Sequence, residues 1–209
     1  MTKPRIILVD DHNIVRRGLA ALLQTDGGYR VVAEAENGEE ALTCVESMPA
    51  EVVVMDLAMP RMSGFEAIRR IVKRNAQIRI LVFSMYDDPQ FVAAALRDGA
   101  RAYVLKQAMD GELFLALDAL IKGGQYVSPV IDMTLVNEQL LDSQELTARE
   151  REVLQLIADG NTTQELADVL QISPHTATRH RANLMQKLNA HNQVELVRVA
   201  AKKGMIILK

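Results

Sequence analysis

The chain has 209 residues, of which 49% are apolar and 24% are charged, and its formal net charge is −3. This profile excludes disordered and fibrous proteins and indicates a soluble globular protein of one large or two small domains. Since no apolar stretch reaches the roughly 18 residues of a membrane helix, and aspartates follow the first apolar run too early for a signal peptide, we expect a cytoplasmic protein without membrane contact.

Five short apolar segments of strand length recur about every 25 residues in the first half of the chain. They are Arg5–Asp10, Arg30–Glu36, Val52–Asp56, Ile78–Ser84 and Ala102–Leu105. The stretches between them carry apolar residues at helical spacing. Because parallel strands need crossover connections, and strands covered on both faces make continuous apolar runs such as "VVVM", this alternation predicts an α/β doubly wound five-stranded parallel sheet.

Polar residues stand at the carboxyl ends of the expected strands: Asp10 and Asp11 after the first, Asp56 after the third, Ser84 after the fourth and Lys106 after the fifth. With strand order 2-1-3-4-5, the first and third strands are neighbours, so three carboxylates would meet in one crevice. Such a cluster needs a compensating cation, and carboxylate oxygens without cysteine or histidine partners suit Mg²⁺. Asp56 could then act as a nucleophile that forms an aspartyl phosphate, with Lys106 neutralising charge.

The segment "VVVMDLAMPRMSG" breaks directly after Asp56. Pro60 and Gly64 are expected to end the strand and to turn the chain so that a helix starts at Ser63. This turn would leave the Asp56 carboxylate exposed above the sheet.

The motifs "ILVDDH", "VVVMDLAMPRMSG", "LVFSMYDD" and "GARAYVLK" resemble, in this order and spacing, the flavodoxin-like receiver domain of two-component response regulators. The resemblance covers about the first 120 residues. It implies that Asp56 is the phosphoacceptor and that Asp11 and Asp56 bind Mg²⁺ directly, together with the backbone carbonyl of Ala58. Asp10 would contribute mainly through water.

The same resemblance assigns roles to three residues that lie in or directly after the last two expected strands. Ser84 and Lys106 would contact the attached phosphoryl group. Tyr103 matches the switch aromatic of the family, which turns inward as Ser84 moves. The interpretation of Tyr103 as an aromatic residue that only fills the edge of the sheet is nearly as good as its interpretation as a switch.

The pattern changes after Lys122, where chain breakers and polar residues mix with a weak helical pattern from Ile131 to Leu141. We therefore predict a receiver domain over residues 1–122, a linker over 123–143 and a small all-α domain over 144–209. From Gln144 onward, nine Lys and Arg residues stand against seven Asp and Glu, whereas the rest of the chain has a charge of −5. This asymmetry is the direction expected if the C-terminal part meets a polyanion.

Four helix starts are predicted in the C-terminal part from N-cap residues and their spacing to a glutamate or proline. They are Thr147 with Glu150, Thr162 with Glu165, Ser173 before Pro174, and Asn192 with Glu195. The helix Thr163–Leu170, the turn "QIS" and the helix that begins at Ser173 have the form of a helix-turn-helix, whose second helix enters the DNA major groove.

In the second helix of the helix-turn-helix, which begins at Ser173, four residues share one face and should pack inward: Ala177, His180, Leu184 and Leu188. The opposite face and the start of the preceding helix supply the candidate DNA contacts: Thr162, Thr163, His175, Thr178, Arg179, Arg181, Ala182 and Lys187. Arg179 could read guanine and Thr178 a base or a thymine methyl, while the others hold phosphates or fit the groove. A surface helix with ordinary charges explains this face about equally well.

The segment "LTAREREVLQLIADGNTTQELADVLQISPHTATRHRANLMQKL" resembles the LuxR-type helix-turn-helix domain, and both resemblances together point to the NarL/FixJ family of response regulators. They imply a sensor histidine kinase as phosphodonor, double-stranded DNA as target and a homodimer on DNA. The final helix, Asn192–Lys202, offers Val194, Val197 and Ala200 as a stripe for dimer contact or for packing within the domain.

Two other classes of protein share part of this pattern. A Mg²⁺-dependent aspartyl-phosphate hydrolase would use the carboxylates, but its nucleophile usually follows the first strand, and the helical domain would have no role. A LuxR-type regulator that senses a small molecule would not need the five polar residues at the strand ends. We therefore expect a transcription regulator that is not an enzyme.

Overall fold

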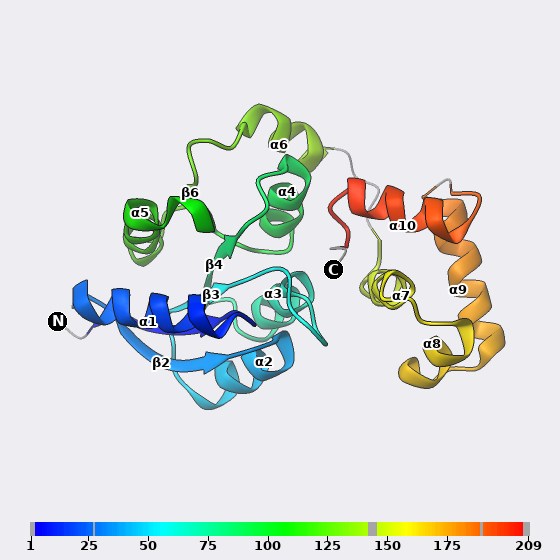
Figure 1. Cartoon of the computed structure of the whole chain (residues 1–209), viewed down its shortest axis with the longest axis horizontal. Coiled ribbons are helices and arrows are strands. Elements are labelled where there is room, and N and C mark those ends of the chain that lie inside the picture. Colours follow the sequence, from blue (N-terminus) through cyan, green and yellow to red (C-terminus); the bar gives the residue numbers. More distant parts are fainter. Residues whose placement is uncertain (1–2, 27, 142–145, 189, 207–209) are drawn as a thin grey trace. The chain divides into compact units, whose positions relative to one another are not determined.

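The computed structural model (Figure 1) describes residues 3–26, 28–141, 146–188 and 190–206. A parallel sheet occupies the first part of the chain, in the order β2-β1-β3-β4-β5-β6. Its strands are β1 (Arg5–Val9), β2 (Arg30–Ala35), β3 (Val52–Met55), β4 (Arg79–Ser84), β5 (Ala102–Leu105) and β6 (Tyr126–Val127). The doubly wound parallel sheet and the order 2-1-3-4-5 of its first five strands are thus confirmed.

The sheet has one strand more than predicted. β6 lies in the segment expected to be a linker and pairs in parallel with β5, where Tyr126 stands opposite Ala102 and Val127 opposite Tyr103. A strand of two residues is too short to show the alternation by which strands are recognised in a sequence. Its pairing with β5 is a contact over more than 20 residues of chain, which a local pattern cannot reveal.

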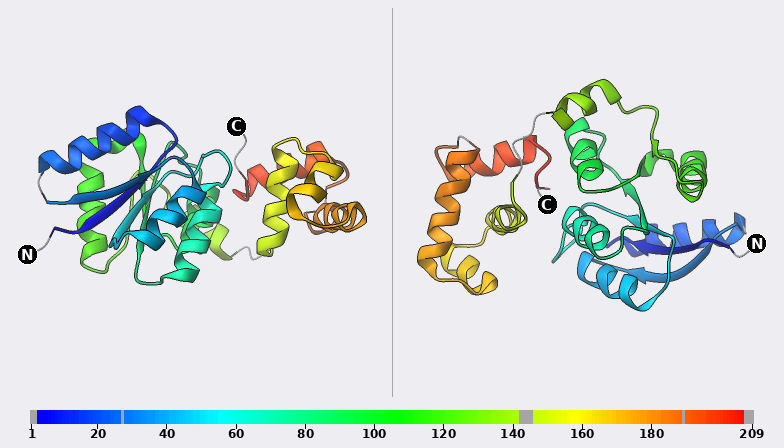
Figure 2. Two further views of the ribbon diagram at one scale, coloured as in Figure 1. Left: turned by 90° about the horizontal axis from the view of Figure 1, so that it is seen from below. Right: turned by 180° about the vertical axis from the view of Figure 1, so that it is seen from behind.

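Helices cover both faces of the sheet (Figures 1 and 2). In the first part of the chain they are α1 (Asn13–Asp26), α2 (Gly38–Ser47), α3 (Gly64–Arg74), α4 (Pro89–Arg97), the 3-10 helix η1 (Lys106–Ala108), α5 (Met109–Ile121) and α6 (Met133–Leu141). Leu19 and Leu23 of α1 share one core with Leu113 and Leu117 of α5. α2, α3 and α4 pack side by side on the opposite face. All four residues of β3 are consequently buried, as expected for a strand covered on both faces.

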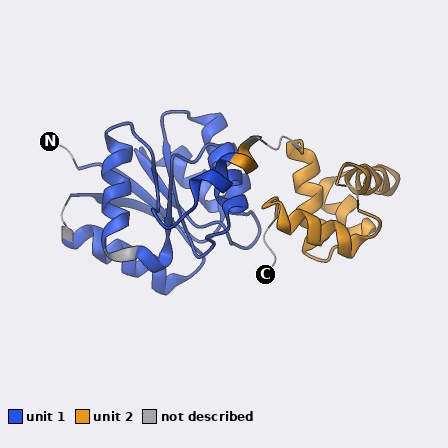
Figure 3. Cartoon of the chain, turned by 90° about the horizontal axis from the view of Figure 1, so that it is seen from above, with its two compact units in different colours: residues 1–137 blue, residues 138–209 orange. Residues whose placement is uncertain are grey.

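The chain divides into two compact units, residues 1–137 and 138–209, coloured separately in Figure 3. The division falls within α6, whereas the expected boundary between residues 143 and 144 lies outside the described residues. The second unit contains α7 (Ala148–Ala158), α8 (Thr163–Leu170), α9 (Pro174–Lys187) and α10 (Gln193–Lys202). Among the residues that the structure describes, none of the helices is both long enough and apolar enough to cross a membrane.

Side-chain caps begin all four helices of the second unit, as predicted. Thr147, Thr162, Ser173 and Asn192 each accept a hydrogen bond from the backbone N–H three residues further on. The capping boxes of Thr147 and Thr162 are complete. The expected reciprocal bond at Asn192 differs, because the Glu195 carboxylate accepts from the backbone N–H of His191 instead, at 2.8 Å.

α8 and α9 form the predicted helix-turn-helix. α8 ends at Leu170, and its C-cap Gln171 has a φ of +52°, in the left-handed region. Ser173, the N-cap of α9, follows two residues later. Ala177, Leu184 and Leu188 are buried as expected, while His180 is half-buried.

The second unit has a core of its own, in which Leu154, Leu166, Leu184 and Leu196 are fully or almost fully buried. The apolar stripe expected on α10 divides accordingly. Ala200 is buried in this core and Val197 packs against it, whereas Val194 is 78% exposed. Of the three residues proposed for dimer contact, only Val194 faces solvent fully.

We predict that Leu184→Ala destabilises the second unit by about 2–5 kcal/mol, because it removes a fully buried side chain and leaves a cavity. In calorimetry of the full chain, the transition of the second unit should move to lower temperature while that of the first unit stays in place. Val194→Ala, which shortens an exposed side chain of the same unit, is the matched control and should change stability by less than about 0.5 kcal/mol. Equal shifts of both transitions by Leu184→Ala would contradict independent cores.

Candidate functional site

The strand-end residues meet at the carboxyl edge of the sheet. The Lys106 Nζ atom lies 2.7 Å from Asp10 Oδ2 and 2.9 Å from Asp56 Oδ2, so one ammonium bridges two carboxylates. Asp56 Oδ1 accepts the backbone N–H of Leu57 at 2.8 Å. The convergence follows from the strand order, because β1 and β3 are neighbours.

The expected exposure of the Asp56 carboxylate is wrong. Asp56 is only 3% exposed and Asp10 only 2%, while Asp11 beside them is exposed. Lys106 contacts both carboxylates and is itself only 9% exposed, so its side chain contributes to their burial. The turn at Pro60 and Gly64 determines the path of the backbone after β3. The burial of the Asp56 carboxylate depends also on residues from other parts of the chain.

Burial and neighbouring charges shift the acid–base equilibria of this site. Burial raises the pKa of Asp56, and Lys106 opposes this effect while the nearby Asp10 adds to it. For Lys106, burial lowers the pKa, but Asp56 and Asp10 more than offset that effect and the pKa is raised overall. Lys106 therefore remains a cation at neutral pH.

Asp10, Asp11 and Asp56 form an acidic pocket that could bind a metal ion. Together with His12 they offer ligand atoms that all lie within 4.8 Å of one another. Three carboxylates face the single ammonium of Lys106, so negative charge is left over for a cation to balance. The half-buried Ala58, whose carbonyl is the remaining expected ligand, lies two residues after Asp56.

His12 was not among the expected site residues. Its Nδ1 atom lies 2.9 Å from Asp11 Oδ1 and 3.3 Å from Asp10 Oδ1, and its backbone N–H donates to Asp10 Oδ1 at 2.9 Å. Its position directly after two aspartates is the only signal by which the sequence could have indicated it.

The break after Asp56 has a steric cause at Gly64. Its backbone N–H donates to the Leu57 carbonyl at 3.0 Å, and a Cβ atom there would lie 2.1 Å from the carbonyl oxygen of Asp56. Ser63 caps α3 by accepting the N–H of Glu66, so the predicted helix start is confirmed. Only glycine lets α3 begin against the backbone that carries Asp56.

Ser84 and Tyr103 are both tied to Tyr86. The fully buried Ser84 accepts the backbone N–H of Tyr86 at 3.3 Å, and the Tyr103 hydroxyl donates to the Tyr86 carbonyl at 2.7 Å. Tyr103 is fully buried, and burial raises the pKa of its hydroxyl. Its strand, β5, lies between β4 and β6, so Tyr103 does not stand at an edge of the sheet.

The candidate DNA contacts of α9 fall into two groups. His175, Thr178, Arg179 and Ala182 are exposed on one side of the helix. Arg181 and Lys187 are half-buried and already have partners. Arg181 donates to the Gln193 side chain, and Lys187 Nζ lies 2.9 Å from the Glu150 carboxylate.

The start of α8 is organised by Thr162. Its hydroxyl donates to the Glu165 carboxylate at 2.8 Å and accepts the Glu165 N–H at 3.3 Å, and Thr163 is half-buried as the first residue of α8. Both lie in the same unit as α9. The exposed candidates on α9 are thus accessible to a ligand, although the Thr178 hydroxyl already donates to the Pro174 carbonyl at 2.9 Å. Arg181, Lys187 and Thr162 would likewise have to share or exchange their present partners.

Two family descriptions match the chain. Residues 6–118 match the response regulator receiver domain, and residues 144–200 match the bacterial regulatory proteins of the luxR family. The transcriptional regulatory protein DegU of Brevibacillus brevis is 33% identical over 225 residues, which cover 98% of this chain and 95% of that protein. The oxygen regulatory protein NreC of Staphylococcus carnosus strain TM300 is 36% identical over 214 residues, which cover 97% of this chain and 99% of that protein.

Solved structures agree with these matches. A two-component response regulator of the LuxR family from Aurantimonas sp. SI85-9A1 is 38% identical, covers 68% of this chain and all of its own, and gives a TM-score of 0.62. RcsB of Salmonella enterica serovar Typhimurium, bound to promoter rprA in the presence of the phosphomimetic BeF3-, is 29% identical with a TM-score of 0.61. That match covers 96% of this chain and 99% of the RcsB chain.

We predict that Asp56→Asn stabilises the first unit at pH 7 and raises its unfolding midpoint. A carboxyl with a raised pKa in the folded state is stabilising only while it is protonated, so at neutral pH the ionised Asp56 is destabilising. The advantage of the variant should shrink as the pH falls through the pKa of folded Asp56. Thermal unfolding between pH 7 and pH 4 measures it.

Asp11→Asn is the control for this prediction, because it removes an exposed carboxylate from the same cluster. If burial is the main cause of the raised pKa of Asp56, Asp11→Asn should change the unfolding midpoint less than Asp56→Asn does. An Asp56→Asn protein less stable than the original at pH 7 would contradict the prediction.

Proposed function

The chain belongs to the response regulators that join a receiver domain to a LuxR-type DNA-binding domain, and we propose that Asp56 is the residue through which its receiver domain is switched. It is a DNA-binding response regulator of a two-component system and regulates transcription. The observation that best supports the role of Asp56 is the contact between its buried carboxylate and Lys106, in a pocket shared with Asp10 and Asp11.

In the proposed reaction, a carboxylate oxygen of Asp56 attacks the phosphorus atom of a phosphohistidine on a sensor histidine kinase. The new bond joins the Asp56 oxygen to phosphorus while the phosphorus–nitrogen bond of the donor breaks. The donor imidazole keeps the electron pair of that bond and takes up a proton. The Lys106 ammonium, which already lies 2.9 Å from Asp56 Oδ2, offsets the negative charge of the phosphoryl oxygens.

Mg²⁺ is the metal ion that we propose for the acidic pocket. Its preferred ligands are oxygens, and the carboxylates of Asp11 and Asp56 with the Ala58 carbonyl would hold it, with Asp10 as a further acidic group. When bound, the ion supplies positive charge against the phosphoryl oxygens. The surplus of carboxylates over ammonium groups in the pocket supports this assignment.

Ser84 and Tyr103 form the proposed switch. Ser84 lies at the end of β4, and its hydroxyl donates to a phosphoryl oxygen on Asp56 in this proposal. Because Ser84 accepts from the N–H of Tyr86 and Tyr103 donates to the carbonyl of the same residue, a displacement of Ser84 also affects the partner of Tyr103. The surface formed by the segment after β4 would change in this way.

The second unit binds DNA through its helix-turn-helix in the proposed mechanism. Arg179 addresses guanine edges from the exposed side of α9, and His175, Thr178 and Ala182 fit against the groove beside it. Phosphate contacts from Thr162, Thr163, Arg181 and Lys187 complete the interface.

We further propose a homodimer on DNA, in the cytoplasm, without catalytic turnover of free phosphoesters. RcsB has been solved as two dimers bound to two parallel DNAs, at 28% identity to this chain and a TM-score of 0.60. Pairing two helix-turn-helix units on one site joins two modest half-site affinities, which suits a C-terminal part with an excess of only two positive charges.

We predict that incubation with acetyl phosphate and Mg²⁺ adds the mass of one phosphoryl group to the intact protein, and that Asp56→Asn abolishes the adduct. The variant has a neutral amide in place of the nucleophilic carboxylate, and its fold should remain intact. Intact-protein mass spectrometry measures the adduct, with EDTA in place of Mg²⁺ as a control that should reduce it at least about tenfold. An adduct that persists in Asp56→Asn would assign the phosphoryl group to another residue.

We predict that Arg179→Ala weakens binding to a DNA duplex selected by the original protein from a random pool by about 10- to 100-fold, the value of one good base contact. Arg198→Ala is the matched control, because it removes an exposed arginine of the same unit from α10. It should weaken binding only slightly, and equally for selected and random DNA. Equal losses in both variants would mean that Arg179 contributes only general charge.

A further inference from the structure

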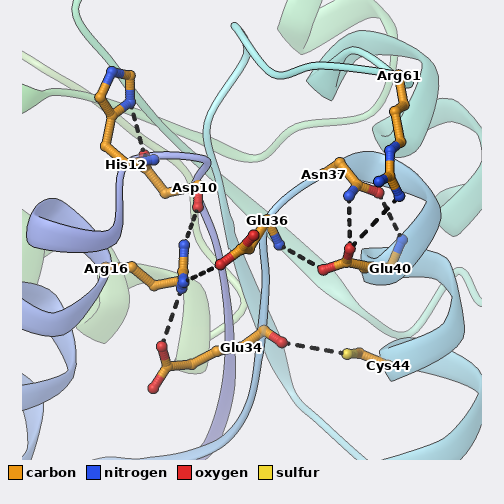
Figure 4. Close-up of polar contacts among 9 residues, drawn as sticks. All are labelled: Asp10, His12, Arg16, Glu34, Glu36, Asn37, Glu40, Cys44 and Arg61. Carbon is orange, nitrogen blue, oxygen red and sulfur yellow. Dashed lines mark hydrogen bonds and ion pairs between the residues drawn. The ribbon is translucent and has the colours of Figure 1, made fainter.

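Arg16 is a buried charge outside the expected site. It lies in the first turns of α1, is 6% exposed, and points its guanidinium at three acceptors (Figure 4). Nη1 donates to the backbone carbonyl of Asp10 at 2.7 Å, Nε to Glu34 at 3.1 Å and Nη2 to Glu36 at 2.7 Å. The two glutamates balance its charge, so the buried arginine is stable where it lies.

The bond from Arg16 to the Asp10 carbonyl is one of two hydrogen bonds that hold the backbone of Asp10. The N–H of Asp10 donates to the Ala35 carbonyl of β2 at 3.1 Å, and its own carbonyl is held by Arg16. Arg16 therefore leaves the Asp10 carboxylate to Lys106 and to the acidic pocket. What the guanidinium sets is the direction in which the chain leaves β1, and with it the positions of Asp10 and Asp11.

The network continues from Arg16 toward the loop that follows Asp56. The backbone N–H of Glu36 donates to Glu40 at 3.0 Å, and the same carboxylate accepts from the Asn37 side chain at 2.8 Å and lies 4.0 Å from Arg61 Nη1 (Figure 4). Arg61 belongs to the segment between β3 and α3.

A backbone contact reinforces this connection. The N–H of Gly38 at the start of α2 donates to the Met62 carbonyl at 3.2 Å, and a Cβ atom at Gly38 would lie 2.7 Å from the Met62 side chain. The turn between β2 and α2 thus touches both loops that supply the carboxylates: the loop after β1 through Arg16, and the loop after β3 through Glu40 and Gly38.

We propose that Arg16 is a positioning residue that holds the Asp10–Asp11 loop in the geometry needed to bind the divalent cation, a role that rests on the proposed function of Asp56. A lysine could not replace it, because an ammonium lacks the planar fork that reaches a carbonyl and two carboxylates at once. Groups that orient the ligands of a metal typically change its affinity by about 10- to 100-fold when they are removed.

The test uses Mn²⁺ alone as the probe of the pocket, measured as the loss of the free-ion paramagnetic resonance signal on titration with the full chain. Arg16→Lys should raise the dissociation constant for Mn²⁺ at least about tenfold, and Glu36→Ala, which removes an exposed partner, should raise it less. Arg17→Gln, a change at the exposed neighbouring arginine of α1, should leave it unchanged. Circular dichroism at the titration temperature verifies that each variant is folded.

Equal Mn²⁺ binding by folded Arg16→Lys and the original protein would overturn the proposal, since a purely structural arginine alters the unfolding temperature but not the affinity of the folded protein. If Arg16→Lys does not fold, Glu36→Ala decides: an unchanged dissociation constant overturns the proposal and an increased one supports it. The phosphoryl adduct on the original protein is measured separately, so a failure of Asp56 as acceptor is distinguished from a failure of Arg16 as positioning residue.

Discussion

The site depends on one ammonium group that bridges two buried carboxylates. Lys106 contacts Asp10 and Asp56 at once, although the three residues follow three different strands. Removing charged groups from water is costly, and such a cluster adds little to stability compared with apolar packing of the same volume. The parallel strand order β1-β3-β4-β5 brings the three strand ends to one edge of the sheet. The buried charges at that edge lower the stability of the fold, and the apolar packing of the strands offsets this cost.

Features that depend on residues close together along the chain were predictable from the sequence. The strands, the helix caps at Thr147 and Ser173 and the glycine turn at Gly64 are encoded in short spacings. Arg16 was not found, because an arginine on the first turns of a helix looks like a solvated residue until Glu34 and Glu36 are known to face it. The burial of Asp56 was missed for the same reason, since a residue that contacts its carboxylate, Lys106, lies 50 residues further along the chain.

The helix-turn-helix shows the same limit on a smaller scale. Periodicity alone separated the inward face of α9 from the outward face, and Ala177 and Leu184 are buried accordingly. It could not show that Lys187 reaches Glu150 on α7 or that Arg181 reaches Gln193 on α10. Pairs of this kind join different helices, so a basic residue on the outward face of a helix can already have a partner before DNA is bound.

The sixth strand connects the chain that follows α5 to β5, the strand that carries Tyr103 and is followed by Lys106. The N–H of Ser128 donates to the Tyr103 carbonyl at 2.9 Å, and the Ser128 hydroxyl accepts the N–H of Leu105 at 3.2 Å while donating to the Glu112 carboxylate. Tyr103, Leu105 and Ser128 are fully buried, so breaking the bonds between them without replacement would cost free energy. A displacement of the end of β5 would therefore carry residues 126–128 with it or break these bonds.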